Sequence, residues 1–261
     1  MNAIATRELR LAYDGHQVVD CLDLMIPNGK VTSLIGPNGC GKSTILKAAG
    51  RILKPQKGWV LLNGSDIQAL PTREVAKRMS ILPQTPTAPA GLTVRELVSY
   101  GRFPRRHGLG KEKKEDEDKI TWAMEVTRLT GLETTAVDAL SGGQRQRVWI
   151  AMALAQETDL ILLDEPTTYL DMAYQLEVLE LLEKLNRERN CTIAMVLHDL
   201  NLASRFSDFL VAIRDESIIA QGTPEEIMTP GVLRDTFHID AEIAADPRTG
   251  RPACISYHLI D

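Results

Sequence analysis

The chain has 261 residues, of which 44% are hydrophobic and 25% charged, proportions typical of a globular protein with a sizeable core. Its net charge of −5 and pI of about 5.6 disfavour nucleic acid as the main partner, because proteins that bind nucleic acid usually carry a basic excess. No apolar run approaches the roughly 20 residues that cross a bilayer, and the first residues lack the apolar segment of a secretory signal. The four cysteines are scattered, without a CxxC pair, which disfavours metal and disulfide frameworks. We therefore expect a soluble chain in a reducing cytoplasm.

Short strands are predicted in the first third of the chain. Arg7–Tyr13 alternates apolar and charged residues, and Val31–Ile35 is a compact apolar run. Trp59–Leu62 precedes the tight turn Asn63-Gly64, which is typical of a strand end. Between these strands, a helix is predicted over residues 43–50.

The middle of the chain has a helical pattern instead. Thr93 and Glu96 have the spacing of a capping box, which predicts a helix that ends near Tyr100. The charge run 111–119 mixes both signs and predicts a solvated helix face or loop. Helical periodicity resumes over residues 120–132.

Buried strands return in the last hundred residues. Leu160–Leu163 and Thr192–Leu197 are continuous apolar runs, the pattern of a parallel sheet with helices on both faces. Gln175–Arg189 is amphipathic and predicts a helix between them. The remaining expected elements are a hairpin made of 209–213 and 217–220 and a helix whose capping box is 223–226. This order predicts an α/β fold with a helical insertion and a small antiparallel sheet.

A glycine-rich loop follows the strand at 31–35 and opens the helix after it. Its residues, Gly36-Pro37-Asn38-Gly39-Cys40-Gly41-Lys42-Ser43, match the P-loop pattern G-x-x-x-x-G-K-[ST] in the context that this motif requires. The backbone N–H groups of such a loop surround phosphates, and the helix N-terminus adds positive potential. We expect Lys42 to reach the β- and γ-phosphates of ATP and Ser43 to ligate Mg²⁺, with Thr44 next in the binding loop. Cys40 is interpreted as a small filler at a variable position.

Two acidic residues end the apolar strand at 160–163. The strand delivers Asp164 towards Mg²⁺ and places Glu165 beside the γ-phosphate. A carboxylate at that point can polarise the attacking water, a role worth about 10²–10⁴ in rate.

A second glycine-rich turn, Leu140-Ser141-Gly142-Gly143-Gln144, lies about a hundred residues after the P-loop and continues as Arg145-Gln146-Arg147. Ser141, the two glycines and the helix N-terminus behind them suit a γ-phosphate. One nucleotide cannot easily need both turns from the same chain. The sequence therefore predicts a head-to-tail pair of chains, each offering this turn to the nucleotide held by the other.

With these motifs, nearly the whole chain resembles the ATP-binding subunit of ABC transporters. The resemblance implies a P-loop NTPase with a RecA-like core, an antiparallel β subdomain and an inserted helical subdomain. The core would span about 1–90 and 160–261, and the helical subdomain about 91–159. In this family the LSGGQ turn binds the nucleotide of the opposite subunit.

The resemblance also carries four single residues over to this chain. Gln84 matches the glutamine that senses Mg²⁺ and water and links them to the membrane subunit. Asp171 matches the aspartate that crosses the dimer interface, and His198 matches the histidine that contacts the γ-phosphate. Tyr13 matches the aromatic residue on which adenine stacks, a contact worth about 1–3 kcal/mol.

One P-loop, one LSGGQ turn and no membrane span indicate a detached subunit of an importer. The segments Gly101–Pro104, Thr167–Asp171, Gln175–Leu179 and Asp246–Pro252 are similar to those of iron–siderophore importers. We expect a homodimer on the cytoplasmic face of a membrane permease, served by an extracytoplasmic binding protein, with no nucleic acid partner. A vitamin B12 or haem importer subunit stays an alternative, as does a soluble ABC ATPase that acts on nucleic acid or ribosomes. A small-molecule kinase would leave LSGGQ without a purpose.

A basic cluster follows Gln84 within the helical insertion. It consists of Arg102, Arg105, Arg106 and His107. Two interpretations stay open: a surface that docks on the permease, and a solvated basic loop.

Overall fold

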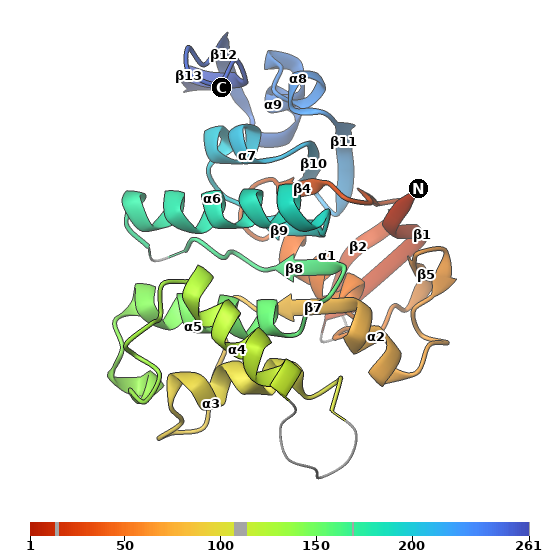
Figure 1. Cartoon of the computed structure of the whole chain (residues 1–261). Helices are drawn as coiled ribbons and strands as arrows, with labels where there is room; N and C mark the ends of the chain where they lie inside the picture. Colours follow the sequence, from red (N-terminus) through yellow and green to blue (C-terminus); the bar gives the residue numbers. More distant parts are fainter. Residues whose placement is uncertain (14–15, 107–113, 169, 261) are drawn as a thin grey trace.

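A mostly parallel sheet forms the centre of the computed structural model, which describes residues 1–13, 16–106, 114–168 and 170–260 (Figure 1). Within these residues the strand order is β11-β10-β4-β9-β8-β7. Neighbouring strands from β10 to β7 pair in parallel, and β11 pairs with β10 as the predicted antiparallel hairpin. The strands are β4 (Val31–Ile35), β7 (Met79–Leu82), β8 (Leu160–Leu163), β9 (Thr192–Val196), β10 (Phe209–Arg214) and β11 (Ser217–Gly222).

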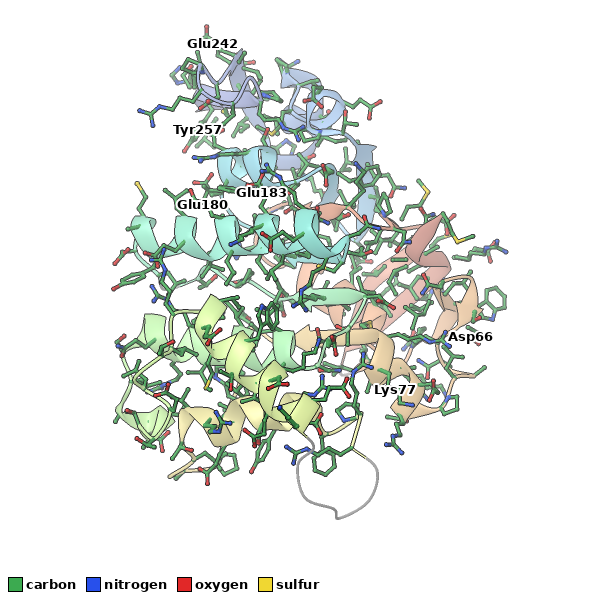
Figure 2. All side chains as sticks on the ribbon, in the orientation of Figure 1. Asp66, Lys77, Glu180, Glu183, Glu242 and Tyr257 are labelled. Atoms are coloured by element: carbon green, nitrogen blue, oxygen red, sulfur yellow. The ribbon has the colours of Figure 1, made fainter. Side chains whose placement is uncertain are left out.

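Successive residues of the central strands serve two different cores, because side chains alternate between the faces of a sheet. In β8, Ile161 and Leu163 pack with the helices of the middle and the C-terminal third of the chain. Leu160 and Leu162 pack on the opposite face, with α1 (Lys42–Ala49) and the N-terminal strands. Side chains fill the space between these layers (Figure 2). The continuous apolar runs therefore confirm the prediction of a sheet that is covered on both faces.

A second sheet is antiparallel and lies beside the central one (Figure 1). Its long strand β1 pairs with β2, β3 and β5, and β5 also pairs with β6. The helix α2 (Thr72–Arg78) follows it and leads into β7. The strands are β1 (Asn2–Tyr13), β2 (His16–Leu22), β3 (Met25–Pro27), β5 (Lys57–Leu62) and β6 (Ser65–Asp66). The antiparallel subsheet is confirmed, with β1 several residues longer than the alternation predicted.

The helices of the middle region gather below the sheet in Figure 1. They are α3 (Val94–Ser99), the 3-10 helix η1 (Tyr100–Arg102), α4 (Lys114–Val126), the 3-10 helix η2 (Val137–Ala139) and α5 (Gly142–Ala155). Both halves of the capping box before α3 are present, with Thr93 accepting from Glu96 and Glu96 accepting from Thr93. This part of the helical prediction is confirmed.

The next helix ends six residues earlier than predicted, and it begins within the charge run that was expected to be a helix face or a loop. Instead of 120–132, α4 begins at Lys114 and ends at Val126. It stops because Arg128 adopts a left-handed conformation with φ 57°. The N–H of Leu129 then closes the turn on the carbonyl of Met124 at 2.8 Å. Leu129 and Leu132 continue the apolar spacing, but they lie in a loop, where Leu129 is buried and Leu132 packs against the same core.

Arg102 of the basic cluster is buried, so it belongs neither to a docking surface nor to a solvated loop. Arg102 is 2% exposed, and its Nε donates to Asp116 at 2.7 Å. Its Nη1 donates to the carbonyl of Ala155 at 2.9 Å, which joins η1, α4 and α5. Arg105 donates to the carbonyl of Gln156 at 3.0 Å. Asp116 is buried too, so the charge run is not wholly solvated. His107 and residues 111–113 lie outside the described residues.

The C-terminal third completes the layers. The predicted amphipathic helix begins three residues earlier than expected, because Asp171 caps it. The last elements of the chain were not predicted. Helix α9 leads into a hairpin, β12–β13, which packs on α7. The elements are α6 (Met172–Arg189), α7 (Leu200–Phe206), α8 (Pro224–Ile227), α9 (Pro230–Phe237), β12 (Ile239–Ala245) and β13 (Pro252–Leu259). Among the described residues, no helix has the length and apolar character that a membrane crossing requires.

Candidate nucleotide-binding site

Neighbouring parallel strands deliver the predicted site residues to one edge of the central sheet. The P-loop follows β4, Gln84 follows β7, Asp164 and Glu165 follow β8, and His198 follows β9. Because β7, β8, β9 and β4 are adjacent in that order, their carboxyl ends meet at one crevice. Ligands of open α/β sheets bind at such an edge.

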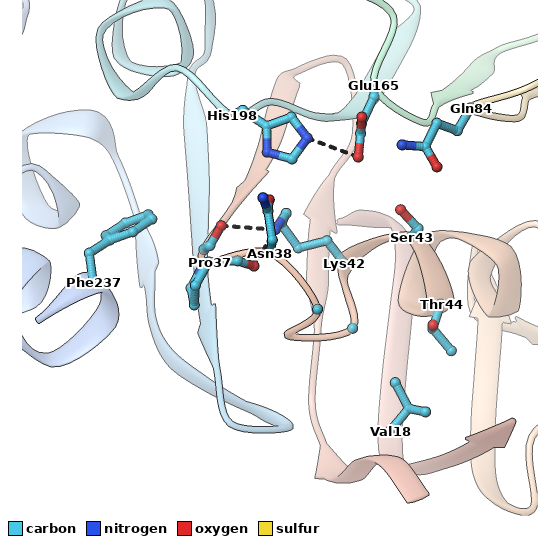
Figure 3. Close-up of a pocket in the computed structure, with 13 residues that line it drawn as sticks. Val18, Pro37, Asn38, Lys42, Ser43, Thr44, Gln84, Glu165, His198 and Phe237 are labelled. Atoms are coloured by element: carbon cyan, nitrogen blue, oxygen red, sulfur yellow. Dashed lines mark hydrogen bonds and ion pairs between the residues drawn. The ribbon is translucent and has the colours of Figure 1, made fainter. Parts of the chain in front are cut away.

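The P-loop has a backbone that its glycines alone can adopt. Gly36 has φ +152°, and a Cβ on it would lie 2.1 Å from the carbonyl oxygen of Ile213. Gly41 has φ +97° and is the N-cap of α1. The side chain of Lys42 is buried, and its Nζ donates to the carbonyls of Gly36 at 2.8 Å and Pro37 at 2.7 Å (Figure 3). The loop therefore holds a lysine ammonium at its centre, where phosphate oxygens can bind it.

Ser43 and Asp164 fit a magnesium ion. Ser43 Oγ donates to Asp164 Oδ1 at 2.7 Å, whereas the buried Oδ2 of Asp164 has no hydrogen-bond partner among the described residues. Burial raises the pKa of Asp164, the nearby Glu165 carboxylate raises it further, and the Ser43 hydrogen bond opposes the shift. A cation beside this carboxylate would relieve the cost of its burial. No group of three or more His, Cys, Asp or Glu residues in the described ranges could hold a metal by itself. Mg²⁺ would therefore complete its shell with phosphate oxygens and water, as it usually does.

Glu165 is held at the mouth of the crevice by several hydrogen bonds. His198 Nε2 lies 2.8 Å from Glu165 Oε1 (Figure 3), and Thr168 Oγ1 donates to Oε2 at 2.9 Å. Burial raises the pKa of Glu165, but hydrogen bonds from His198, Thr168 and Gln84 outweigh it and leave the pKa below its usual value. Its φ of 53° is left-handed, which is strained for a residue with a side chain. Glu165 is therefore an ionised, oriented carboxylate.

Residues of the P-loop line one cavity of about 770 Å³ together with Gln84, Glu165 and His198, within the size range of small-molecule sites. Asp164 is not among the lining residues but is hydrogen-bonded to Ser43, which is. Two lining residues carry no sequence motif: Val18 on β2, and Phe237 at the end of α9 (Figure 3). Cys40 is buried behind the loop, consistent with its interpretation as a filler. The side chain of Tyr13 lies outside the described residues, so the adenine contact stays a prediction. The predicted residues that line the cavity are Gly36, Pro37, Asn38, Gly39, Gly41, Lys42, Ser43, Thr44, Gln84, Glu165 and His198.

The LSGGQ turn and Asp171 do not line this cavity. Ser141 is the exposed N-cap of α5, and it forms a capping box with Gln144. Asp171 is the exposed N-cap of α6, where its carboxylate accepts from the N–H of Tyr174 at 3.0 Å. The two turns are neighbours, since a Cβ on Gly143 would lie 3.9 Å from the Tyr174 ring. The structure thus brings the predicted residues together in two groups rather than one.

The fold and the cavity define a P-loop nucleotide-binding protein. The family model of the ABC transporter matches residues 19–168. The chain belongs to this family and is an ABC-type ATPase.

Similar proteins align over nearly their whole length. The chain is 55% identical to the iron(3+)-hydroxamate import ATP-binding protein FhuC of Bacillus subtilis, covering 100% of this chain and 97% of the relative. It is 51% identical to the achromobactin transport ATP-binding protein CbrD of Dickeya dadantii, with coverages of 98% and 96%. Among solved structures, a transporter described as of the metal-chelate type, in an inward-facing conformation, matches with a TM-score of 0.82 at 28% identity, covering 97% and 96%.

Proposed function

We propose that this protein hydrolyses ATP to power the import of an iron(III)–siderophore complex through a separate membrane permease. The observation that carries the proposal is the 55% identity, over the full chain, to an iron(3+)-hydroxamate import ATP-binding protein. The second relative, named for achromobactin transport, supports the same cargo class. The cavity supplies the chemistry, because it combines a P-loop with an oriented carboxylate.

In this proposal each residue of the cavity acts on one part of MgATP. Lys42 binds the β- and γ-phosphates as a point charge. Ser43 and Asp164 hold the magnesium, which when bound neutralises charge on the phosphates. Glu165 accepts a hydrogen bond from the attacking water and orients it, since it is ionised and held in place.

Four further residues would complete the site. His198 lies against Glu165 and would contact the γ-phosphate. Gln84 lines the same cavity and would sense magnesium and water from the β7 side. Tyr13 would stack on adenine, and Asp171 would cross to the partner.

Two chains, each contributing a different turn, would form each complete site. A head-to-tail homodimer places Ser141, Gly142, Gly143 and Gln144 of one chain against the γ-phosphate held by the other. The separation of the LSGGQ turn from the cavity supports this arrangement. A solved dimeric bacterial ABC transporter cassette matches with a TM-score of 0.76 at 29% identity.

The dimer would bind a permease at the cytoplasmic face of the membrane and work with an extracytoplasmic binding protein. The helical subdomain at about 91–159 and the core at about 1–90 and 160–261 are the parts that would move relative to each other. Closure around two ATP molecules and reopening after hydrolysis would switch the permease between its two facing states.

Mixing two inactive variants tests the shared site. Lys42→Ala loses the phosphate cation, and Ser141→Arg places a bulky cation where the partner's γ-phosphate should lie. Each variant alone should be inactive. A mixed dimer has one site with both lesions and one site with neither, so hydrolysis should return. A fully active Ser141→Arg homodimer would remove the shared-site model, whereas folded variants that show no recovery on mixing would show that the two sites are strictly coupled.

Cells that lack this protein test the cargo. Growth should fail when iron is available only as a ferric siderophore and should recover with abundant simple iron salts. Restoring the gene should restore uptake of radiolabelled iron, whereas the Glu165→Gln variant should not. If uptake from every tested chelate persists while vitamin B12 or haem uptake is lost, the iron–siderophore assignment is wrong and the importer class stands.

A further inference from the structure

Gln146 and Arg147, which follow Arg145 after the LSGGQ turn, contact Pro166 and two residues of α6. Gln146 Nε2 donates to the carbonyl of Pro166 at 3.0 Å. Arg147 forms an ion pair with Glu177 and lies over the Tyr174 ring, 4.9 Å from its centroid. Neither residue lines the nucleotide cavity, so the mechanism above leaves both unexplained.

The geometry of the two helices gives these contacts a common purpose. Ser141 caps α5, and Asp171 caps α6. Arg147 and Glu177 each lie six positions beyond those caps, about 9 Å along each helix at 1.5 Å per residue. The pair therefore fixes the two helices at matching depth, directly behind the turns that face the partner chain.

Apolar residues of α5 and α6 share one core, yet a cavity remains at this seam. Between α4, α5 and α6 lies a second cavity of about 400 Å³, and Arg147 and Glu177 line it. Arg147 is 16% exposed at its side chain and Glu177 is 34% exposed. A partly buried pair that is bidentate or stacked holds geometry better than an exposed one. The contacts of Arg147 therefore join α5 to α6 across this cavity, in addition to the apolar packing of the two helices.

We propose that Gln146 and Arg147 are positioning residues that hold the LSGGQ turn against Pro166 and the first turns of the chain's own α6, in the place where the partner's ATP needs it. The proposal rests on the shared-site dimer. It adds the contacts within one chain that hold the LSGGQ turn, the part of each site that the partner supplies. The planar guanidinium of Arg147 contacts the Glu177 carboxylate and the Tyr174 ring at the same time. A lysine, with a single compact ammonium, does not reproduce both contacts.

The chain offers a matched control at the same carboxylate. Arg128, at the end of α4, also pairs with Glu177, at 2.8 Å. It is 70% exposed and lies outside the helix that carries the LSGGQ turn. Arg128→Met therefore removes an equal charge from Glu177 without releasing α5.

The mixed dimer of Lys42→Ala and Ser141→Arg chains tests the proposal, because all its activity comes from one site. That site uses the LSGGQ turn of the Lys42→Ala chain and Glu165 of the Ser141→Arg chain. Adding Gln146→Met and Arg147→Met to the Lys42→Ala chain should lower hydrolysis about tenfold. Adding them to the Ser141→Arg chain should change it by less than about twofold.

Placement distinguishes positioning from a general loss of structure. If the two residues were merely structural, the double substitution would lower activity equally in either chain. If it acted on the neighbouring Glu165, it would lower activity only in the Ser141→Arg chain. Either result overturns the proposal. Arg128→Met should be neutral in both chains, and Arg147→Lys should be intermediate in the Lys42→Ala chain. Thermal melting of each variant alone checks folding. If the Ser141→Arg homodimer is fully active, the shared-site model fails instead, which separates the two conclusions.

Discussion

The P-loop and the LSGGQ turn are both glycine-rich turns that open a helix, but the chain surrounds them differently. The P-loop follows the fully buried strand β4, and its Lys42 is bound by the loop's own carbonyls. The LSGGQ turn is exposed at Ser141 and Gly142, and its helix end is satisfied by its own capping box. The first turn is therefore built by one chain, whereas the second presents a finished surface to something outside the chain.

This difference separates binding from catalysis. A site built by one chain can bind ATP without a partner, because its donors and its cation are already in place. A turn that lies outside that cavity can act only when another molecule brings a nucleotide to it. Variants in the two regions should therefore fail in different ways.

The largest expected effect is the contrast between Lys42→Ala and Glu165→Gln. Lys42→Ala should lose both ATP binding and hydrolysis, since the cation of the loop is removed. Glu165→Gln keeps the shape and the magnesium ligands, so ATP should still bind while hydrolysis falls about 10²–10⁴-fold. Size-exclusion chromatography with ATP should then show a stable dimer for Glu165→Gln only. Loss of ATP binding in Glu165→Gln would make that carboxylate structural.

Glycine replacements sharpen the same contrast in stability. In Gly36→Ala the new methyl would meet the Ile213 carbonyl at 2.1 Å with φ at +152°, so unfolding should become easier by about 3–5 kcal/mol. A methyl on Gly142 meets no atom within 4 Å in the single chain. Gly142→Ala should therefore keep the free energy of unfolding within about 1 kcal/mol.

Gly142→Ala should affect hydrolysis strongly although it hardly affects stability. Gly142→Ala should bind ATP normally as a monomer, yet lose activity about 10²-fold, because the methyl lies where the partner's phosphate must approach. Urea unfolding and monomer ATP titration measure the two quantities. An active Gly142→Ala dimer would show that the LSGGQ turn does not approach phosphate closely.

Local sequence patterns predicted the parts of the molecule whose conformation is determined by a few neighbouring residues. The P-loop glycines, the Thr93 capping box and the continuous apolar run Leu160–Leu163 each encode a conformation over a few neighbouring residues, and the structure shows all three. The same holds for the clustering of strand ends, because parallel neighbours bring their carboxyl ends together.

The features that sequence reasoning missed depend on distant partners. Arg102 looked like a surface cation until Asp116 and the Ala155 carbonyl, 53 residues away, were seen to enclose it. Phe237 reaches the cavity because α9 folds back over the sheet edge, and one aromatic residue after a helical stretch carries no such signal. The end of α4 at Val126 was missed because apolar spacing continues through a left-handed turn at Arg128.

Asp164→Asn tests whether the buried carboxylate beside the P-loop cavity lowers the stability of the protein when no metal is bound. Because burial raises the pKa of Asp164, the carboxylate form costs stability above the pKa of an unfolded aspartate, near 3.9. The neutral amide should raise the melting temperature of the nucleotide-free protein by about 2–4 °C near neutral pH and remove magnesium-dependent hydrolysis. Asp171→Asn is the control from the LSGGQ half: it is an exposed N-cap, where asparagine caps equally well, so its melting temperature should not change. A lower melting temperature for Asp164→Asn would mean that the charge is already compensated in the fold.

The smallest expected effect is a pH dependence of the free energy of unfolding, which we expect for a variant in the P-loop cavity and not for one in the LSGGQ turn. The pKa of Glu165 is lowered in the folded chain by its hydrogen bonds from His198, Thr168 and Gln84, against the opposing effect of burial. Its contribution to stability is therefore fully present above the unfolded pKa of about 4.3, and it is lost as the pH falls through the lower folded value. The free energy of unfolding should favour the native chain over Glu165→Gln by about 1 kcal/mol or less near pH 7, with the gap closing at more acidic pH. Ser141→Ala, on a turn without a titratable group, should differ from the native chain by the same amount at every pH. Urea titrations across the pH series measure both gaps. A gap for Glu165→Gln that stays constant with pH would show that the carboxylate and its hydrogen-bond donors are not coupled as the geometry indicates.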